Sequence, residues 1–258
     1  MNNRYALVTG ASSGIGYQYA RVMAGYDYNL IIVSNEEAIF EKAGCLTEEY
    51  SVHVIALLRD LGQENAAKEL FDYCQKEHLL VEVLINNAGV YHSRDFIEDT
   101  EGFNKLIMNL HMTTPAMLSY YFGQEMAKRK EGYILNMCSV TSHIAVQKLA
   151  TYSATKAFLT NFTRSLHVEL RYQGVGVTAV SPGAVATSLY NLNEKATRFG
   201  LSLGYIVTPE KLARKGVKAM FKRRAKASIP SFYNGILIAL VSLIPTGLLR
   251  LIRKWGWF

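Results

Sequence analysis

A tyrosine and a lysine four positions apart are the side chains of this chain whose types and spacing most directly suggest chemistry. Residues 149–170 carry apolar or small side chains in helical period, which predicts one long helix that includes Tyr152 and Lys156. Residues four apart share a helix face, so the lysine ammonium would stand beside the phenol. A neighbouring cation favours the phenolate and lowers the pKa of a tyrosine from about 10. The pair therefore predicts a general acid–base that works near neutral pH.

Ser139 precedes this tyrosine by thirteen positions and follows an apolar strand predicted at 133–138. A hydroxyl at the end of that strand could reach the same space as Tyr152. Taken alone, a tyrosine and a lysine at this spacing are more typical of an ordinary pair on a helix surface. The catalytic interpretation therefore depends on the elements around them.

A glycine-rich turn lies near the start of the chain, where residues 10–16 read Gly-Ala-Ser-Ser-Gly-Ile-Gly. It joins a predicted strand at 5–9 to a helix that runs to about residue 25. Glycines let backbone N–H groups approach a pyrophosphate, and the helix N-terminus favours negative charge. The spacing is G-x-x-x-G-x-G rather than G-x-G-x-x-G. A tight strand-to-helix turn without a ligand is the alternative.

Strands and helices then alternate along the chain. Further strands are predicted at 28–34, 52–58, 81–85, 133–138 and 175–180, and the helices between them at 36–50, 63–78, 101–129 and 149–170. This order predicts one α/β domain, a doubly wound Rossmann-type fold with a parallel sheet of about seven strands and helices on both faces. Ligands bind at the carboxyl ends of such strands, and each motif falls at one of those ends.

The assembled motifs resemble the short-chain dehydrogenase/reductase family over roughly residues 4–232. They are TGASSGIG (9–16), Asp60, NNAG (86–89), Asn109, Ser139, YSATK (152–156) and SPG (181–183) with Thr187. Within the family, an apolar segment at 188–206 and an apolar, basic tail at 233–258 resemble the reductases of long-chain 3-keto lipids, such as 3-ketosphinganine and 3-ketoacyl reductases. It implies a nicotinamide-dependent oxidoreductase that interconverts a carbonyl and a secondary alcohol.

The resemblance also implies catalytic roles for four residues. Tyr152 would protonate the substrate oxygen during reduction, and Lys156 would bind the nicotinamide ribose and lower the tyrosine pKa. Ser139 would hydrogen-bond the substrate carbonyl. Asn109 would hold a water that links Lys156 to bulk solvent. Alternatively, Asn109 is only an exposed polar residue of its helix.

The cofactor contacts implied by the resemblance lie at the ends of five strands. Asp60 would accept the adenine amino group, although it could also be a simple turn former. Besides Tyr152 and Lys156, the implied contacts are Gly10, Ser12, Ser13, Gly14, Ile15, Gly16, Ser34, Asn35, Asp60, Leu61, Asn87, Ala88, Gly89, Pro182, Gly183, Val185 and Thr187.

The end of the second strand decides between NAD and NADP. A carboxylate there binds the ribose 2′-OH, whereas a basic or donating residue accepts a 2′-phosphate. Ser34 stands where NAD-dependent members carry aspartate, and Asn35 stands where NADP-dependent members carry arginine. Both can donate hydrogen bonds to a phosphate, while Glu36 is an unfavourable neighbour. The sequence therefore favours NADP(H) over NAD(H).

Two regions lie outside the shared core. Residues 188–206 carry apolar side chains that suit a lid over a hydrophobic substrate, or simple packing of a surface helix. Residues 233–258 form an apolar, basic C-terminal tail. Residues 211–258 hold eleven of the 28 Lys and Arg and no Asp or Glu. Residues 1–210 therefore hold 17 basic and 21 acidic residues, which gives −4, against +11 for the remainder.

The tail predicts an interfacial anchor on an anionic membrane, because Lys, Arg and Trp flank an apolar segment too short and too interrupted by Pro245 to span it. Its alternative is a cover for the substrate cleft or a subunit interface. Nucleic acid is not expected as a partner. Three cysteines without metal-ligand spacing predict no metal site and a reducing compartment.

We expect a cytoplasmic enzyme without a signal peptide that assembles as a homodimer or homotetramer. Its tail would make it peripheral on the inner face of a membrane. Its predicted substrate is a hydrophobic ketone. Hydroxysteroid dehydrogenase activity is the alternative within the family. The alternative of another class is a non-catalytic binding protein that senses the cofactor, which would not need to retain Tyr152.

Overall fold

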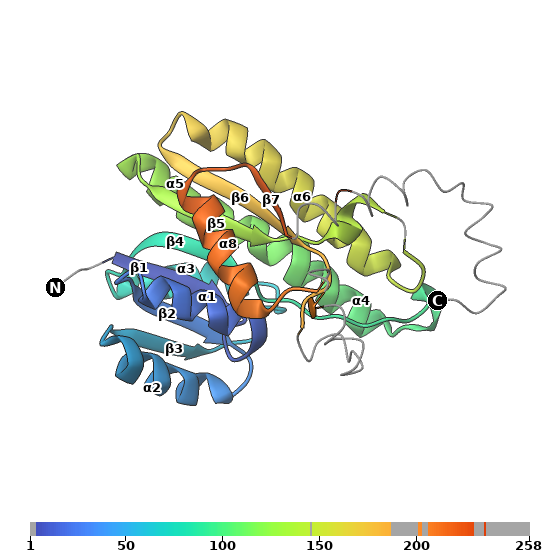
Figure 1. Cartoon of the computed structure of the whole chain (residues 1–258), viewed down its shortest axis with the longest axis horizontal. Helices are drawn as coiled ribbons and strands as arrows, with labels where there is room; N and C mark the ends of the chain where they lie inside the picture. The colour runs from blue at the N-terminus through green and yellow to red at the C-terminus, as the bar shows by residue number, and fades with distance from the viewer. Residues whose placement is uncertain (1–3, 145, 187–200, 203–205, 230–234, 236–258) are drawn as a thin grey trace.

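A seven-stranded parallel sheet forms the centre of the protein (Figure 1). The computed structural model describes residues 4–144, 146–186, 201–202, 206–229 and 235. The strand order is β3-β2-β1-β4-β5-β6-β7, and every neighbouring pair is parallel. The strands are β1 (Arg4–Thr9), β2 (Asn29–Ser34), β3 (Val54–Leu58), β4 (Leu80–Asn86), β5 (Gly132–Met137), β6 (Val175–Pro182) and β7 (Lys226–Ile229).

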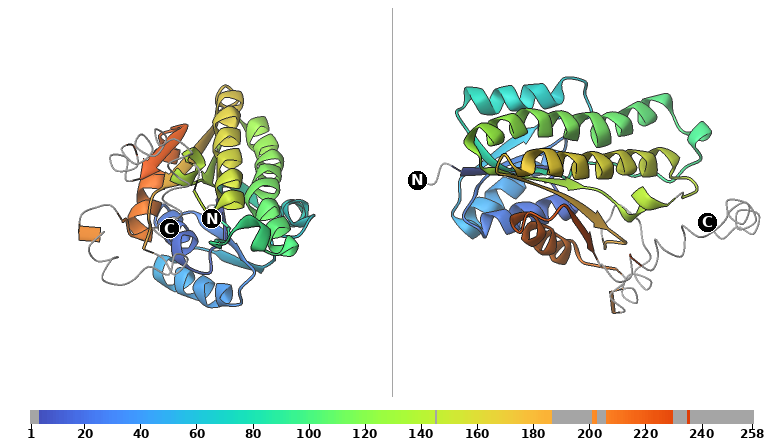
Figure 2. Two further views of the ribbon diagram at one scale, coloured as in Figure 1. Left: turned by 90° about the vertical axis from the view of Figure 1, so that its right-hand side faces the viewer. Right: turned by 90° about the horizontal axis from the view of Figure 1, so that it is seen from above.

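Helices cover both faces of this sheet, as the right-hand view of Figure 2 shows. On one face lie α1 (Gly14–Ala24), α2 (Ala38–Tyr50) and α8 (Pro209–Phe221). The other face carries α3 (Ala66–Lys76), α5 (Thr114–Arg129) and α6 (Ala150–Arg171). Helix α4 (Glu101–Met108) leads into α5, and short 3-10 turns occupy Phe96–Glu98 and Val140–His143. The predicted fold class is confirmed.

The central strands are buried because both faces of the sheet are covered. Residues 30–33 of β2 and residues 83–85 of β4 are all aliphatic and fully buried. Alternate residues of one strand enter opposite cores. Leu30 and Ile32 pack with α1 and α8, whereas Ile31 and Val33 pack with α3 and α5.

The strand order reverses between β1 and β4. Chain segments leave these two neighbouring strands toward opposite faces, and the crevice between them opens at the carboxyl edge of the sheet. The glycine turn after β1 and the Asn-Asn-Ala-Gly segment after β4 therefore lie side by side. The hydroxyl of Thr9, the last residue of β1, accepts hydrogen bonds from the backbone N–H groups of Asn87 and Ala88.

The helix predicted at 101–129 is interrupted in the structure. A π turn over Asn109–Thr113 separates α4 from α5, so the backbone widens at Asn109. The predicted helix at 149–170 agrees with α6 to within one residue at each end. Within the described residues, no helix has the length and apolar character needed to cross a membrane. Most of the predicted lid, and the tail apart from Gly235, lie outside the described residues.

Candidate active site

A cavity of about 360 Å³ opens at the carboxyl edge of the sheet. Among the described residues, the ends of β1, β2, β3, β4, β5 and β6 and the first half of α6 all contribute to its wall. Its size is that of a small-molecule or cofactor pocket. Most of the predicted cofactor contacts line it: Gly10, Ser12, Ser13, Gly14, Ile15, Gly16, Ser34, Asn35, Asp60, Leu61, Asn87, Ala88, Gly89, Tyr152, Lys156 and Pro182.

The glycine turn forms one end of this cavity and has no room for a side chain at Gly10 or Gly16. Gly10 and Gly14 have φ angles of +66° and +54°, which other residues rarely adopt. A Cβ at Gly16 would lie 2.0 Å from the carbonyl oxygen of Gly10. Helix α1 begins here without a side-chain cap and without an acidic residue in its first turn. Its free N–H groups and dipole thus fit a pyrophosphate.

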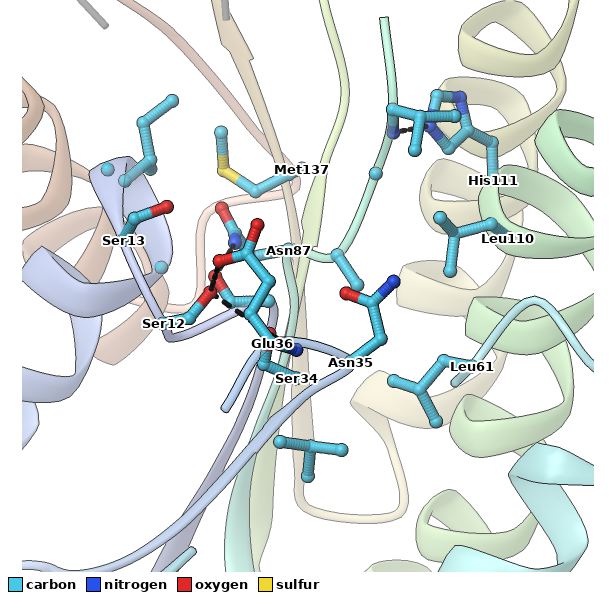
Figure 3. Close-up of a pocket in the computed structure, with 18 of the residues that line it drawn as sticks. Ser12, Ser13, Ser34, Asn35, Glu36, Leu61, Asn87, Leu110, His111 and Met137 are labelled. Carbon is cyan, nitrogen blue, oxygen red and sulfur yellow. Dashed lines mark hydrogen bonds between the residues drawn. The ribbon is translucent and has the colours of Figure 1, made fainter. Parts of the chain in front are cut away.

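Two serines and a glutamate form a hydrogen-bonded group beside the glycine turn (Figure 3). The Ser34 hydroxyl donates to the Ser12 hydroxyl at 2.9 Å, and the Ser12 hydroxyl donates to the Glu36 carboxylate at 2.7 Å. The backbone N–H of Glu36 returns to the Ser34 hydroxyl at 3.1 Å. The Glu36 carboxylate therefore faces the cavity at the end where the 2′-group of the cofactor ribose is predicted to bind. Asn35 lines the same end.

Asp60 follows β3 and organises the next turn. Its carboxylate accepts hydrogen bonds from the Gly62 backbone N–H at 2.9 Å and the Gln63 side chain at 2.7 Å. It is thus a turn former that also lines the cavity. Arg59 lines the cavity beside it, and its backbone N–H donates to Ser34. Its guanidinium forms a long ion pair, 3.7 Å, with Glu69 and lies 5.6 Å from the centre of the Tyr73 ring.

Asn87 fixes the loop after β4 against the glycine turn. Its side-chain amide donates to the carbonyl oxygens of Thr9 at 3.0 Å and Gly10 at 3.2 Å. These contacts hold the two glycine-containing loops together at the strand-order reversal. A Cβ on Gly10 would lie 2.8 Å from the Cα of Ala88, so the approach depends on glycine.

Tyr152 and Lys156 share one buried face of α6, as their spacing predicted. Their relative exposures are 6% each, and the Lys156 ammonium lies 5.8 Å from the centre of the Tyr152 ring. This ammonium donates to the carbonyl oxygen of Met137 at 2.8 Å. Burial lowers the pKa of Lys156 to about 8, although the nearby Cys138 thiol opposes the shift. The burial rules out an ordinary helix-surface pair.

Ser139 follows β5 and caps the short helix at 140–143. Its hydroxyl accepts hydrogen bonds from the Thr141 backbone N–H at 3.2 Å and the Thr141 hydroxyl at 2.9 Å. It is buried but does not contribute to the described wall of the cavity, whereas its neighbour Cys138 does. The predicted role of Ser139 toward a substrate carbonyl stays a prediction.

Asn109 lies at the start of the π turn, and its amide donates to the carbonyl oxygen of Gly62 at 3.2 Å. A second cavity of about 10 Å³ lies beside Lys156, lined in part by Leu110, His111 and the buried Asn86. Asn109 does not line either cavity in the described part of the chain. Its predicted role in holding a water stays a prediction.

The loop after β6 closes the last side of the site. Pro182 lines the cavity, and the Gly183 N–H donates to Ile229 of the edge strand. Val185 is fully buried and pairs with Val207 in a short parallel bridge, so its side chain belongs to the core. Thr187 lies outside the described residues.

Sequence reasoning missed one residue in the centre of the site, His111. It is 1% exposed and lines both cavities, and Figure 3 shows it beside Leu110 in the wall of one of them. Its ring packs edge-on against the Tyr152 ring, with 5.6 Å between centroids. Burial, and then the Lys156 charge, lower its pKa well below the usual value for histidine. The only sequence signal was its position two residues after Asn109. In the described residues, no group of three or more His, Cys, Asp or Glu gathers as a metal site.

A family model for the short chain dehydrogenases matches residues 4–197 of the chain. The chain belongs to this family. That membership places it among the NAD(P)-dependent oxidoreductases, as the motifs predicted. In the cavity, the glycine turn and the capless N-terminus of α1 fit the cofactor of a short-chain dehydrogenase.

Relatives and solved structures resemble this short-chain dehydrogenase at moderate identity. A very-long-chain 3-oxoacyl-CoA reductase of Anas platyrhynchos is 30% identical over 197 residues, which cover 74% of this chain and 62% of that protein. The match thus spans about three fifths of that relative's length. A short-chain dehydrogenase from Sphingobium yanoikuyae in complex with NADPH has a TM-score of 0.79, with 26% identity and coverage of 94% and 96%. A bulky-bulky ketone specific alcohol dehydrogenase from Comamonas testosteroni has a TM-score of 0.77, with 27% identity and coverage of 93% and 94%.

Proposed function

We propose that this protein reduces a hydrophobic ketone to a secondary alcohol, with a long-chain 3-keto lipid as the substrate class. The observation that carries the proposal is the buried Tyr152–Lys156 pair on the wall of the same cavity as the glycine turn. A proton donor and a nicotinamide site within one cavity are the two parts that carbonyl reduction requires. The long-chain 3-oxoacyl relative supports the substrate class.

The bound cofactor would supply the hydride, and the protein would supply the proton and the positions of the reactants. The Tyr152 hydroxyl donates its proton to the carbonyl oxygen as the alcohol forms. Lys156 favours the resulting phenolate and binds the nicotinamide ribose through its ammonium. Ser139 hydrogen-bonds the carbonyl oxygen, and Asn109 holds a water for reprotonation. The glycine turn and the α1 N-terminus hold the pyrophosphate.

An apolar cluster around Tyr152 supports a hydrophobic substrate. Ile107 and Leu149 pack with Tyr152, and Tyr91 and Phe103 lie against them. The Tyr91 ring meets the Tyr152 ring edge-on, with 5.3 Å between centroids. A charged or strongly hydrated substrate would lose hydration at such a surface. Residues 188–206 would extend this surface as a lid.

NADP(H) is the proposed cofactor. Ser34 and Asn35 place donors at the 2′-end of the cavity, and Arg59 lines the same end. The Sphingobium yanoikuyae structure, which contains NADPH, has the same fold. The Glu36 carboxylate opposes this choice, because a 2′-phosphate would meet a like charge there. The balance between Arg59 and Glu36 thus decides the preference.

The test of the function is oxidation of NADPH and of NADH by the full chain with long-chain 3-keto thioesters, 3-keto sphingoid bases and oxosteroids. Turnover of the long-chain 3-keto lipids supports the proposal. Turnover of oxosteroids alone would assign a hydroxysteroid dehydrogenase instead. Tight cofactor binding without turnover of any ketone would support a non-catalytic cofactor sensor.

We further propose that the chain divides into a catalytic domain and a membrane-docking tail. Residues 1–232 form the catalytic domain, and residues 233–258 dock on an anionic membrane surface, from which a lipid ketone can enter the site. Flotation with anionic and neutral vesicles, comparing the full chain with one ended after Phe232, tests the docking. Vesicle binding that survives the truncation contradicts it.

We also propose a homo-oligomer, because Phe158 and Val168 of α6 are apolar side chains that are 43% and 65% exposed. Light scattering measures the subunit number.

A further inference from the structure

His111 connects two parts of the site that come from distant segments. Its Nε2 atom accepts a hydrogen bond from the Val90 backbone N–H at 3.0 Å. Its Nδ1 atom lies 3.2 Å from the Thr155 hydroxyl. Val90 follows the loop after β4, and Thr155 is on α6 between Tyr152 and Lys156. One ring therefore joins the loop after β4 to α6, the helix that carries the proposed proton donor Tyr152.

These partners determine which ring nitrogen carries the proton. The Val90 N–H can only donate, so Nε2 must be unprotonated and Nδ1 carries the hydrogen of the neutral ring. Nδ1–H then donates to the Thr155 oxygen. The Thr155 hydroxyl in turn donates to the carbonyl oxygen of Tyr152 at 2.8 Å. All hydrogen bonds therefore run in one direction, from Val90 to Tyr152.

The surroundings hold the ring in this place. His111 is 1% exposed, and its ring packs edge-on against Tyr152. A Cβ on Gly89 would lie 2.8 Å from Nε2, so the close approach of the loop depends on glycine. The π turn at Asn109–Thr113 positions His111 on the side of the helix that faces the site. An imidazolium would point an N–H at the Val90 N–H and would also repel Lys156.

We propose that His111 is a positioning residue, held as the neutral Nδ1–H tautomer, that fixes Tyr152 relative to the loop 88–90 through Thr155. This proposal rests on the proposed role of Tyr152 as proton donor. A shift of about 1 Å in a reacting group can lower a rate roughly 10²-fold, so loss of this link should lower kcat while leaving cofactor affinity nearly unchanged.

The direct test needs no activity. In the full chain with ¹⁵N-labelled histidine, the chemical shifts of the His111 ring nitrogens should show the Nδ1–H tautomer. These shifts should stay constant as the pH passes through the ordinary histidine pKa. The His111 signals are those that disappear in His111→Gln and move in Thr155→Val. An Nε2–H tautomer, or titration near the ordinary histidine value of about 6.5, would overturn the proposal.

Kinetics then separate positioning from mere stability. Thr155→Val keeps the shape but removes the link, and should lower kcat roughly tenfold with the cofactor Kd changed less than about twofold. Thr160→Val is the matched control, since Thr160 is also a buried threonine of α6 and takes no part in the hydrogen bonds that join Val90, His111 and Thr155. It should leave kcat unchanged. Equal losses in both variants would overturn the proposal.

Two substitutions of His111 can each keep one of its two hydrogen bonds. His111→Gln can retain an acceptor for Val90, whereas His111→Asn can retain a donor for Thr155. Thr155→Val should cost nothing further in His111→Gln, because the link is already lost. Additive losses of kcat in the double variant would contradict the positioning role.

If Tyr152→Phe keeps wild-type turnover, the proposed function itself fails. If Tyr152→Phe is inactive while Thr155→Val is fully active, only the positioning role of His111 fails.

Discussion

The Ser12 hydroxyl donates a 2.7 Å hydrogen bond to the Glu36 carboxylate, and this contact lies at the end of the cavity that we propose for the 2′-group of the cofactor ribose. It joins the glycine turn after β1 to the loop after β2. Ser34 supports it by donating to the same Ser12 hydroxyl. A phosphate that enters here must displace the carboxylate or accept a like charge beside it. The two residues therefore make cofactor choice a question of charge at a few atoms.

Glu36→Gln should favour NADPH. The substitution keeps an acceptor for Ser12 and removes the charge, so we expect NADPH affinity to rise about tenfold, which corresponds to about 1.4 kcal/mol, while NADH affinity stays within twofold. Quenching of cofactor fluorescence gives both dissociation constants. Ser34→Asp is the opposite control and should weaken NADPH. A Glu36→Gln protein with unchanged NADPH affinity would mean that no phosphate binds near Glu36.

Arg59→Gln should act in the other direction. The guanidinium forms a long, 3.7 Å ion pair with Glu69 and lies 5.6 Å from the centre of the Tyr73 ring. Turning toward a 2′-phosphate would exchange these contacts for a closer charge pair. We expect its loss to weaken NADPH about tenfold and to leave NADH unchanged, because only NADPH carries that charge. The same fluorescence titration measures it. Equal weakening of both cofactors would show that Arg59 supports the fold of the site rather than the phosphate.

The sequence predicted those features of the site that depend on chain order and local geometry. In a parallel sheet all carboxyl ends share one edge, so motifs that follow strands meet there. The Tyr152–Lys156 pair was predictable because helical spacing alone places it. The glycine turn was predictable because its conformation requires glycine at Gly10 and Gly14.

Other features depend on tertiary packing and left no periodic signal. The apolar pattern of residues 101–129 continues through the π turn, so the interruption at Asn109 was not visible. One buried histidine, His111, gives no pattern and owes its partners to the loop after β4. From the sequence, Glu36 was expected only to be an unfavourable neighbour of a 2′-phosphate. Its hydrogen bond with Ser12 was not predicted, because the direction of its side chain is fixed only in the folded loop.

Tyr152→Phe should stop catalysis without releasing the cofactor. The change removes only the hydroxyl and keeps the ring contacts with Tyr91 and His111. Loss of general acid catalysis should lower kcat by roughly 10²–10⁴, with cofactor affinity retained. Tyr91→Phe removes a hydroxyl from the adjacent ring and should change kcat only a few-fold. Steady-state rates and fluorescence titration report both values, and an active Tyr152→Phe enzyme would refute the proposed role.

Cofactor affinity should fall as the pH rises above 8. Burial lowers the pKa of Lys156 to about 8 in the free protein, so its ammonium loses the proton above that pH. The ribose hydroxyls should favour the charged form, which raises the lysine pKa in the complex. Between the two pKa values, the dissociation constant should rise about tenfold per pH unit, with uptake of a proton on binding.

Fluorescence titrations on both sides of pH 8, and calorimetry in two buffers of different ionisation enthalpy, measure the affinity and the proton uptake. Lys156→Met removes the titrating group and is the control. Its weaker binding should not vary with pH in this range. A wild-type affinity that is constant through pH 8 would show that Lys156 keeps one charge state in the free protein and the complex.

The close approach of the glycine turn to α1 leads to a paired test of the pyrophosphate site. A Cβ at Gly16 would lie 2.0 Å from the Gly10 carbonyl oxygen, so Gly16→Ala must push the turn away. We expect it to destabilise the protein by about 1–3 kcal/mol and to weaken the cofactor at least about tenfold. Gly44→Ala in α2 meets no atom within 4 Å and should stabilise by about 0.5–1 kcal/mol without affecting binding. Urea unfolding and fluorescence titration measure both effects, and a Gly16→Ala protein that binds cofactor normally would exclude this turn as the pyrophosphate site.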